Sequence, residues 1–471
     1  MAASDTRAGS GRRAAVIGAG PAGFYASEQL LNEGFEVDLI DMLPTPFGLV
    51  RAGVAPDHPK IKSVTRVYEK TAAREGFRFF GGIELGADIA AEELRDRYHT
   101  IVYAVGTPDD NRLGIPGEDR PGSYPATRFV AWYNGHPHFC DESFDLSARR
   151  AVVIGNGNVA VDVARMLLVA PEELAVTDTA DHALEQLAAA RVTEVVLLGR
   201  RGPAQAAFTN PELRELGELT RAAVDVDPAQ LDLDEHSAAW LEAEGDATAK
   251  RNVEILREYA SRSPNGSSHG IALRFLCSPM EILGDGEDGP VTGVRVVHNR
   301  IERTADGRLR AVPTDRVEVI ECGLVLRSIG YRGRALPDVP FDEERGVIRN
   351  SGGRVCGEAG EPLPGEYVVG WIKRGPSGVI GTNKKDAADT VAKIVEDAQA
   401  GRLLEPSNAD AADTAEWLIG SSTAAVEWAG WEAIDAHERD LGEGAGRPRV
   451  KLVRMSELID VSRAGAAPSR T

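Results

Sequence analysis

Residues 12–42 read RRAAVIGAGPAGFYASEQLLNEGFEVDLIDM, and this stretch decides the fold. An apolar run is followed at once by the pattern Gly18-x-Gly20-x-x-Gly23, then by a stretch with helical periodicity, and then by a second apolar run that ends at Asp41. Strand, glycine turn, helix and strand in this order make a βαβ unit. The sequence therefore predicts a doubly wound α/β domain at the start of the chain.

The glycine pattern also predicts a nucleotide site. Gly18 permits the tight turn, Gly20 lets the backbone approach a diphosphate, and Gly23 lets the helix pack against the strand. The helix that opens at Pro21 offers unpaired N–H groups and the positive end of its dipole to the phosphates. Asp41 stands where an acid binds a ribose hydroxyl. The pattern by itself does not choose between NAD and FAD.

A second βαβ unit begins at residues 149–168, RRAVVIGNGNVAVDVARMLL, and its partner strand is TEVVLLGRR at 193–201. Where an NAD site carries an acid, this strand is followed by Gly199, Arg200 and Arg201. Arginine binds phosphate through a charge-assisted and often bidentate fork. The pair therefore predicts a site for the extra phosphate of NADP.

Two features favour FAD in the first unit. The glycine-rich turn GPSGVIG at 375–381 opens an expected helix over 379–400, whose dipole can stabilise negative charge on a flavin ring. Trp371 comes just before this turn and can flank the ring. A further strand, TIVYAVG, ends at Gly106. Two nucleotide sites in one chain indicate electron transfer from NADPH to a bound flavin.

Composition excludes several other classes of protein. The 471 residues carry a formal net charge of −20, which argues against nucleic-acid or anionic-membrane binding. The four cysteines are scattered and form no C-x-x-C pair, so we expect no metal site, disulfide framework or redox-active dithiol. No apolar run approaches the ~20 residues of a membrane span. These features predict a reduced, cytoplasmic protein.

Four longer stretches resemble the adrenodoxin reductase family of ferredoxin–NADP reductases, and most closely its actinobacterial NADPH–ferredoxin reductases. They are MLPTPFGLVRAGVAPDHPKIKSV (42–64), GNGNVAVDVARMLL (155–168), GRRGPAQAAFTNPELREL (199–216) and VVGWIKRGPSGVIGTNKKDA (368–387). The resemblance runs from about residue 12 to about 455.

The resemblance implies a glutathione reductase-like fold with two Rossmann-like three-layer domains. An FAD domain would comprise 1–109 and 336–471, with 1–11 as a flexible tail, and an NADP domain would comprise 110–335. The expected FAD contacts are Gly18, Gly20, Pro21, Ala22, Gly23, Asp41, Leu49, Ile83, Gly106, Trp371, Gly378, Val379 and Ile380. The expected NADP contacts are Asn156, Gly157, Asn158, Val159, Arg200, Arg201, Glu212 and Gly378.

The activity implied is that of an NADPH–ferredoxin oxidoreductase: a hydride passes from NADPH to FAD, and single electrons then pass to an iron–sulfur ferredoxin. His58 and Glu215 lie in motifs where the family places polar active-site residues. His58 stands between two prolines in APDHPK, which disfavour helix and stiffen the segment, so it can hold or relay a proton. The alternatives are an NADPH-dependent flavin monooxygenase and the electron-input subunit of a larger complex, which would normally carry cysteine clusters.

A ferredoxin is usually acidic, and local charge governs docking because the Debye length is about 8 Å at physiological salt. Residues 58–74 contain several basic side chains and a single acidic one, Glu69. A helix would align Arg66, Lys70 and Arg74 on one face. A second basic cluster comprises Lys373, Arg374, Lys384 and Lys385. We expect the partner to dock on the first group, which is Lys60, Lys62, Arg66, Lys70 and Arg74.

Overall fold

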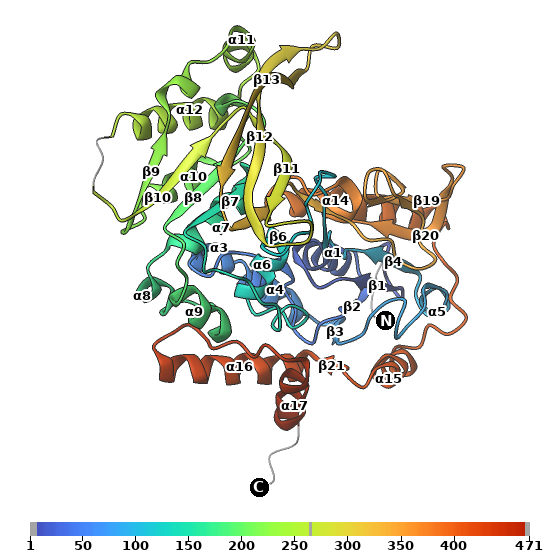
Figure 1. The fold of residues 1–471 in the computed structure, drawn as a ribbon. Coiled ribbons are helices and arrows are strands. Elements are labelled where there is room, and N and C mark those ends of the chain that lie inside the picture. Colours follow the sequence, from blue (N-terminus) through green and yellow to red (C-terminus); the bar gives the residue numbers. More distant parts are fainter. Residues whose placement is uncertain (1–6, 263–265, 467–471) are drawn as a thin grey trace. The chain divides into compact units, whose positions relative to one another are not determined.

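The computed structural model describes residues 7–262 and 266–466. It divides into two compact units, Met1–Asp110 with Gly330–Thr471, and Asn111–Ile329 (Figure 1). Of the expected flexible tail, residues 1–6 lie outside the described residues. Residues 7–11 form a turn instead of a free tail, because the Gly9 N–H donates to the Glu33 carbonyl oxygen at 2.8 Å.

The first unit contains an eight-stranded sheet in the order β18-β19-β20-β4-β1-β2-β3-β21. Its core strands are parallel and pair in the order β3-β2-β1-β4-β20, as expected of a Rossmann-like domain. Their bounds are Arg13–Ile17 (β1), Glu36–Ile40 (β2), Phe77–Gly81 (β3), Thr100–Tyr103 (β4) and Pro362–Val368 (β20). Short antiparallel strands flank them: Asn350–Ser351 (β18), Arg354–Cys356 (β19) and Val426–Glu427 (β21).

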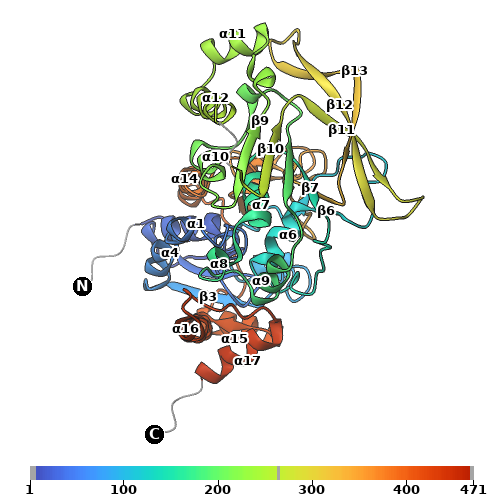
Figure 2. The same cartoon turned by 60° about the vertical axis from the view of Figure 1, so that its left-hand side comes forward.

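Both faces of this sheet are buried, which makes the unit three-layered. Along β1, Ala14 and Val16 belong to one apolar cluster and Ala15 and Ile17 to another, because successive side chains of a strand point to opposite faces. The helices are Pro21–Asn32 (α1), Leu49–Ala52 (α2), Pro59–Lys62 (α3), Thr65–Ala72 (α4), Ala91–Arg95 (α5), Trp371–Arg374 (α13), Thr382–Gln399 (α14), Ala411–Ser421 (α15), Trp428–Ala445 (α16) and Met455–Ala466 (α17). Helix α16 follows the edge strand β21 directly (Figure 1) and packs beside α17 (Figure 2).

Two small antiparallel pairs complete the first unit. They join Asp109–Asp110 (β5) to Tyr331–Arg332 (β15), and Phe341–Asp342 (β16) to Val347–Ile348 (β17). Because β5 pairs with β15, both belong to the first unit, and the second boundary lies at 330, before the expected residue 336.

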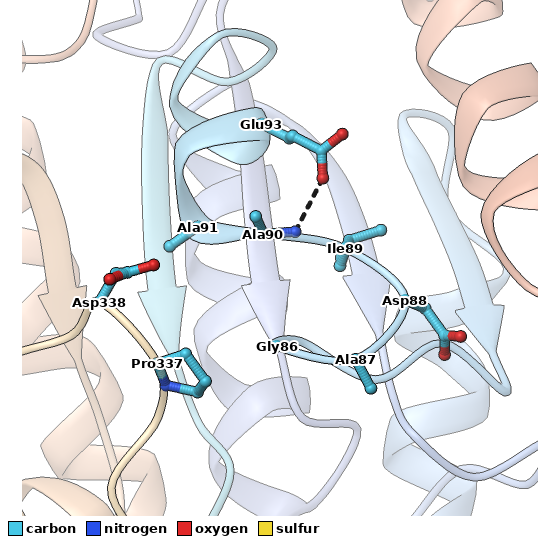
Figure 3. Close-up of a pocket in the computed structure, with 9 residues that line it drawn as sticks. All are labelled: Gly86, Ala87, Asp88, Ile89, Ala90, Ala91, Glu93, Pro337 and Asp338. Atoms are coloured by element: carbon cyan, nitrogen blue, oxygen red, sulfur yellow. Dashed lines mark hydrogen bonds between the residues drawn. The ribbon is translucent and has the colours of Figure 1, made fainter.

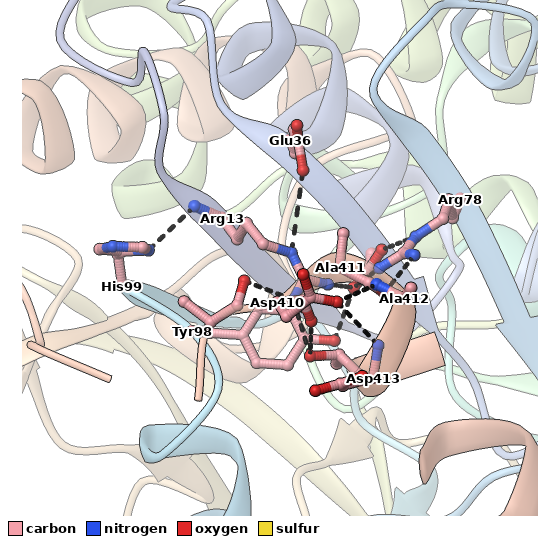
Figure 4. A network of polar contacts seen from close by, with 12 residues as sticks. Arg13, Glu36, Arg78, Tyr98, His99, Asp410, Ala411, Ala412 and Asp413 are labelled. Carbon is pink, nitrogen blue, oxygen red and sulfur yellow. Dashed lines mark hydrogen bonds and ion pairs between the residues drawn. The ribbon is translucent and has the colours of Figure 1, made fainter. Parts of the chain in front are cut away.

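A buried ionic network ties α15 to the sheet (Figure 4). Asp38 on β2 is 2% exposed and accepts hydrogen bonds from Arg78 at 2.7 Å and from the Tyr98 hydroxyl at 2.7 Å, and it forms an ion pair with Arg13. Arg13 also donates to the Thr414 hydroxyl at 2.7 Å, and Arg78 donates to a carbonyl at the start of α15. The network joins three strands to one distant helix.

The second unit contains a six-stranded parallel sheet in the order β6-β14-β7-β8-β10-β9. Its strands are Ser123–Pro125 (β6), Arg150–Ile154 (β7), Glu194–Leu198 (β8), Ala222–Val226 (β9), His269–Arg274 (β10) and Leu324–Arg327 (β14). Its helices are Ala126–Tyr133 (α6), Asn158–Leu168 (α7), Pro171–Leu174 (α8), Asp181–Ala188 (α9), Asn210–Leu216 (α10), Glu235–Ala243 (α11) and Ala247–Ala260 (α12), with 3₁₀ turns at Pro203–Gln205 and Pro228–Leu231. The expectation of two Rossmann-like sheets is confirmed.

A three-stranded antiparallel sheet, for which the sequence analysis made no prediction, packs on the second unit's parallel sheet. Its strands are Cys277–Gly284 (β11), Val291–Arg303 (β12) and Leu309–Glu321 (β13). Val294 and Val296 of β12 join Val152 and Val196 of the parallel sheet in one buried cluster. Among the described helices, none combines the length and apolar character that a membrane span requires.

Candidate functional site

The first glycine loop joins β1 to α1 and has the expected constraints. Gly18 has φ of +109°, and a Cβ atom there would lie 2.6 Å from the carbonyl oxygen of Ala104, so only glycine fits. A Cβ on Gly23 would lie 2.0 Å from the Gly18 oxygen, which shows how closely α1 approaches the loop. A Cβ atom on Gly20 would have no neighbouring heavy atom within 4 Å. The backbone therefore leaves an open cradle beside this residue.

Helix α1 begins at Pro21, and Gly20 provides no side-chain cap. The first N–H groups of a helix have no partner within it, so those of Ala22 and Gly23 are available to an anion together with the positive dipole end. This is the arrangement that a diphosphate requires.

Asp41 directly follows β2 and lies against the same loop. Its carboxylate accepts hydrogen bonds from the Ala19 N–H at 2.6 Å and the Leu43 N–H at 2.9 Å. Burial raises the pKa of Asp41 to about 6, although the two amide hydrogen bonds lower it. The Asp41 carbonyl oxygen accepts the N–H of Ile83 at 3.0 Å, so this expected contact residue lies beside the acid.

The segment that carries Leu49 lies over the glycine loop. The Phe47 N–H donates to the Ala19 carbonyl oxygen at 2.8 Å, and a Cβ on Gly48 would lie 2.9 Å from the Cα of Gly20. Phe47 and Gly48 both have positive φ values, +83° and +49°. Leu49 is 39% exposed at the start of α2.

Gly106 lies near the point where the strand order reverses. Strand β1 pairs with β2 on one side and with β4 on the other, and Gly106 follows β4. In open α/β sheets a ligand binds at such a switch point, at the carboxyl ends of the strands. Gly106 has φ of +70° and open space around its Cβ position.

Trp371 opens α13, and the residue before it, Gly370, lies against α1. A Cβ on Gly370 would lie 2.6 Å from the Cβ of Ala22, so the two chain segments are in close contact. The indole Nε1 of Trp371 is buried and has no hydrogen-bond partner among the described residues. The ring of Tyr331 lies 5.3 Å from that of Trp371.

The glycine-rich turn differs from the prediction in one respect. Helix α14 begins at Thr382 and not at Val379, because the Thr382 hydroxyl accepts the Val379 N–H at 3.1 Å and keeps this residue in a turn before the helix. Gly378 has φ of +81°, and Val379 is 59% exposed. Ile380 packs partly against the apolar cluster of α1.

Asp386 on α14 holds this region together. Its carboxylate accepts hydrogen bonds from the Gly370 N–H at 2.6 Å and from Arg374 Nη1 at 3.1 Å. It also forms an ion pair with Lys373 at 2.8 Å. Arg374 also donates to the Ser377 carbonyl oxygen at 3.2 Å. Two of the four members of the second basic cluster, Lys373 and Arg374, are therefore paired with an acid that holds the turn.

The second glycine loop joins β7 to α7. Gly155 has φ of +136°, and a Cβ atom there would lie 2.0 Å from the Ser328 carbonyl oxygen. Gly157 has open space, provides no side-chain cap, and precedes α7, which begins with Asn158 and Val159. The Nδ2 of Asn156 is buried without a partner among the described residues. The loop repeats the cradle of the first unit.

Arg200 and Arg201 follow β8, which is the neighbour of β7 in the sheet. Arg200 is exposed and Arg201 half-buried, and neither guanidinium has a hydrogen bond or ion pair to any residue that the structure describes. Burial, with a contribution from the Arg200 cation, lowers the pKa of Arg201. Two adjacent cations without a counter-ion fit a phosphate.

Glu212 lies in the first turn of α10, beside the second loop. The Thr209 hydroxyl donates to the Glu212 carboxylate, and the Thr209 N–H donates to Asn158 Oδ1 at 2.8 Å. One threonine therefore links Glu212 to the residue that opens α7. The structure brings the expected NADP contacts of the second unit together around this loop, while Gly378 belongs to the first unit.

His58 and Glu215 belong to different units. His58 is 9% exposed and is the N-cap residue of α3, and its Nε2 lies 3.9 Å from the Asp57 carboxylate. Glu215 on α10 is partly exposed, and its carboxylate lies 3.4 Å from Arg165 Nη1.

Two other features of the described residues contain none of the predicted site residues. Cys277, His298 and Glu318 bring three potential ligand atoms within 4.8 Å, but Arg274 is ion-paired with Glu318 and burial raises the pKa of the Cys277 thiol, so the group is already neutralised without a metal ion. A pocket of about 240 Å³ is lined by residues 86–91, Glu93, Pro337 and Asp338 (Figure 3), none of which is a predicted site residue.

Sequence reasoning missed the residues that position the site. Asp386 is the only acid in the stretch 368–387, so a search for a partner to its cations would have found it. The positive φ of Phe47 and the contact of Gly370 with Ala22 have no comparable local signal.

Comparison with known proteins identifies the family. The model of the pyridine nucleotide-disulphide oxidoreductase family matches residues 12–197. NADPH-ferredoxin reductase FprA of Mycobacterium tuberculosis H37Rv is 49% identical over 460 residues, which cover 95% of this chain and 98% of that protein. The chain belongs to the adrenodoxin reductase-type ferredoxin–NADP reductase family.

A plant member shows the breadth of this family, and a solved structure supports the assignment. The mitochondrial NADPH:adrenodoxin oxidoreductase of Arabidopsis thaliana is 41% identical, with 94% of each chain covered. The solved structure of M. tuberculosis FprA in complex with NADPH has a TM-score of 0.90 at 48% identity, over 96% of this chain and 99% of that one. The predicted resemblance is confirmed.

The residues present fit the two nucleotides of a ferredoxin–NADP reductase. In the first unit the open cradle at Gly20, the uncapped start of α1 and the unpartnered indole N–H of Trp371 provide donors for FAD. In the second unit the unpartnered amide of Asn156 and the arginine pair provide donors for NADP(H).

Proposed function

We propose that this chain is an FAD-dependent NADPH–ferredoxin oxidoreductase. The observation that carries the proposal is the pair Arg200–Arg201, which lacks an acidic partner in the described structure and follows the strand next to the second glycine loop. An acid there would repel the 2′-phosphate, whereas two arginines attract it. When bound, FAD takes two electrons from NADPH and passes them on one at a time to an iron–sulfur partner.

The chain's own residues bind and orient the two nucleotides. In the first unit, Gly18 to Gly23 hold the diphosphate of FAD, Asp41 holds a ribose, and Leu49, Ile83, Gly106, Trp371 and the turn Gly378–Ile380 surround the rest of the cofactor. In the second unit, Asn156 to Val159 hold the NADP diphosphate, and Arg200 and Arg201 hold the 2′-phosphate. Glu212 and Gly378 supply further contacts to NADP.

His58 and Glu215 take polar roles at the site of electron transfer. His58 is buried at the start of α3 and its segment is held between prolines, so its imidazole can hold a proton at a defined position. Transfer from NADPH to flavin needs no protein acid, so we expect neither residue to be indispensable.

The ferredoxin docks on the basic surface of α3 and α4. Lys60, Arg66 and Lys70 are exposed and Lys62 is partly exposed. Arg66 and Lys70 are four residues apart on α4, which places them on one face of the helix. Arg74 contributes less, because it follows the helix and donates to Asn32 Oδ1 at 2.9 Å. An acidic ferredoxin is the partner that this charge fits. We place the protein in the cytoplasm, where NADPH and ferredoxin are both available.

The test begins with the visible spectrum of the purified protein during anaerobic titration with NADPH and, separately, with NADH. Ferredoxin is then added with cytochrome c as the final acceptor. We expect a yellow protein that NADPH bleaches preferentially and that reduces cytochrome c only when ferredoxin is present. A flavin that NADPH bleaches but that reduces no ferredoxin would contradict the proposal and favour the monooxygenase.

A further inference from the structure

The main chain of the arginine pair is held from one side by the start of the antiparallel sheet. Each of three consecutive carbonyl oxygens accepts one hydrogen bond from that region, and two of the three donors are backbone N–H groups. The bonds run from Cys277 N–H to Gly199 at 3.0 Å, from Asn299 Nδ2 to Arg200 at 2.8 Å, and from Leu276 N–H to Arg201 at 3.1 Å.

Asn299 is the only side chain among these three donors. It lies on β12 and is 6% exposed. Its Nδ2 also donates to the Ser278 hydroxyl at 2.8 Å, and its own N–H donates to the Leu276 carbonyl oxygen at 2.7 Å. Both the backbone and the amide of Asn299 are therefore fixed on the same segment, so the amide presents its N–H to Arg200 in one orientation.

The arginine pair needs such support because its guanidinium groups repel each other. No described acid holds either of them, and the Arg200 cation contributes to the lowered pKa of Arg201. Before a phosphate arrives, the positions of the two side chains depend on the backbone from which they extend. The contact between Asn299 and Arg200 spans 99 residues of sequence, so the antiparallel sheet supplies that support.

We propose that Asn299 is a positioning residue for the choice between NADPH and NADH. By holding the Arg200 carbonyl oxygen, it keeps the arginine pair where the 2′-phosphate binds. The inference rests on the proposed function, since it requires that the pair bind this phosphate. A residue with this role affects only cosubstrates that carry the phosphate.

The principal variant is Asn299→Leu, which keeps a similar volume and removes the donor. Loss of a buried hydrogen bond leaves the Arg200 carbonyl oxygen unpaired, and we expect the KM for NADPH to rise about tenfold. The KM for NADH and the kcat at saturating NADPH are expected to stay unchanged. The Kd of adenosine 2′,5′-bisphosphate, measured by calorimetry, should rise by a similar factor, while that of 5′-AMP should not.

Two controls separate this role from a general loss of packing. Asn134→Ala removes another buried amide donor, which bonds the Val130 carbonyl oxygen, and should leave the NADPH to NADH ratio unchanged. Ser278→Ala removes the second partner of the Asn299 amide but leaves its contact with Arg200, so it should have a small effect. If Asn299→Leu does not fold, the smaller Asn299→Ala is measured in the same assays.

An equal loss with both cosubstrates, or no loss with either, would overturn the role of Asn299 alone. A native protein that shows no preference for NADPH would overturn the proposed function and this inference with it.

Discussion

The carboxylate of Asp41 accepts the N–H of Ala19 at 2.6 Å, so the acid at the end of β2 is bonded directly to the glycine loop. The contact spans 22 residues and joins the turn after the first strand of the βαβ unit to the end of its second strand. Because the carboxyl is also buried, its pKa is raised to about 6.

This pKa predicts that FAD affinity rises with pH. The FAD-free protein keeps the Asp41 proton up to about pH 6, whereas a ribose hydroxyl donates to the ionised form. The Kd of FAD for the apoprotein should therefore fall about tenfold between pH 5 and pH 7, measured by flavin fluorescence. Asp41→Ala should weaken binding and flatten this pH dependence. A native protein with equal Kd at both values would contradict the assignment.

The same shift makes a prediction for stability. A carboxyl whose folded pKa is raised holds a proton that the unfolded chain has already released, so the free energy of unfolding falls as pH rises. For Asp41 the window runs from the ordinary pKa of 3.8 to the raised pKa of about 6, and the loss in the FAD-free protein is up to about 3 kcal/mol. Urea unfolding of the apoprotein and of Asp41→Ala at several pH values in this window measures the loss. If the free energies of unfolding of the two proteins changed in parallel with pH, the prediction would be contradicted.

Removing the arginine pair should abolish the discrimination between cosubstrates. Each charge-assisted contact with a phosphate is worth about 1.5–3 kcal/mol, so Arg200→Ala and Arg201→Ala should each raise the KM for NADPH by tens of times and leave that for NADH unchanged. The exposed Arg310→Ala on β13 is the control for loss of one positive charge. If the variant that carries both substitutions, Arg200→Ala and Arg201→Ala, still prefers NADPH, the 2′-phosphate is bound elsewhere.

Charge reversal on α3 and α4 should slow only the reaction with the protein partner. Lys60→Glu, Arg66→Glu and Lys70→Glu in one protein should lower the rate of ferredoxin reduction at least tenfold at low salt, while NADPH oxidation by ferricyanide stays constant. A matched control reverses the exposed Arg308, Arg310 and Arg345, which changes the net charge equally. Similar losses in both triple variants would show that net charge, and not this surface, governs the rate.

Asp38→Ala should destabilise the first unit strongly. Removal of this carboxylate leaves the partly buried Arg78 without its counter-ion and the buried Arg13 with only the exposed Glu36 at 3.9 Å (Figure 4), and breaking a buried pair typically costs about 3–5 kcal/mol. The urea midpoint should fall accordingly, and amides of α15 should lose protection from hydrogen exchange because both arginines also bond that helix region. Asp306→Ala, which breaks the exposed pair with Arg308, should leave the midpoint unchanged. If the urea midpoint of Asp38→Ala fell only slightly, α15 would be held by its apolar contacts alone.

The parts of the fold and site that follow local rules could be predicted from the sequence. Gly18 and Gly155 both need positive φ at a strand end, and Gly20 and Gly157 both leave space before a helix, so the two glycine patterns determine two nucleotide loops. The positions of Asp41 and of the arginine pair follow from strand length, because each follows the second strand of its βαβ motif: Asp41 comes directly after β2, and the pair comes after Gly199 at the end of β8.

The antiparallel sheet, and the hydrogen bonds that hold the site residues in place, could not be predicted because they form between segments that are distant in the sequence. Which carbonyl Asn299 bonds is set by the pairing of β12, which shifts register between Val297 and Asn299. The bond from Gly370 to Asp386 requires α14 to lie beside the end of β20. Periodicity and glycine requirements act over a few residues and therefore determined the two loops and the cosubstrate from sequence alone. Strand register and helix packing arise only when the whole chain is buried together, and so the tertiary structure decided which residues hold those loops in place.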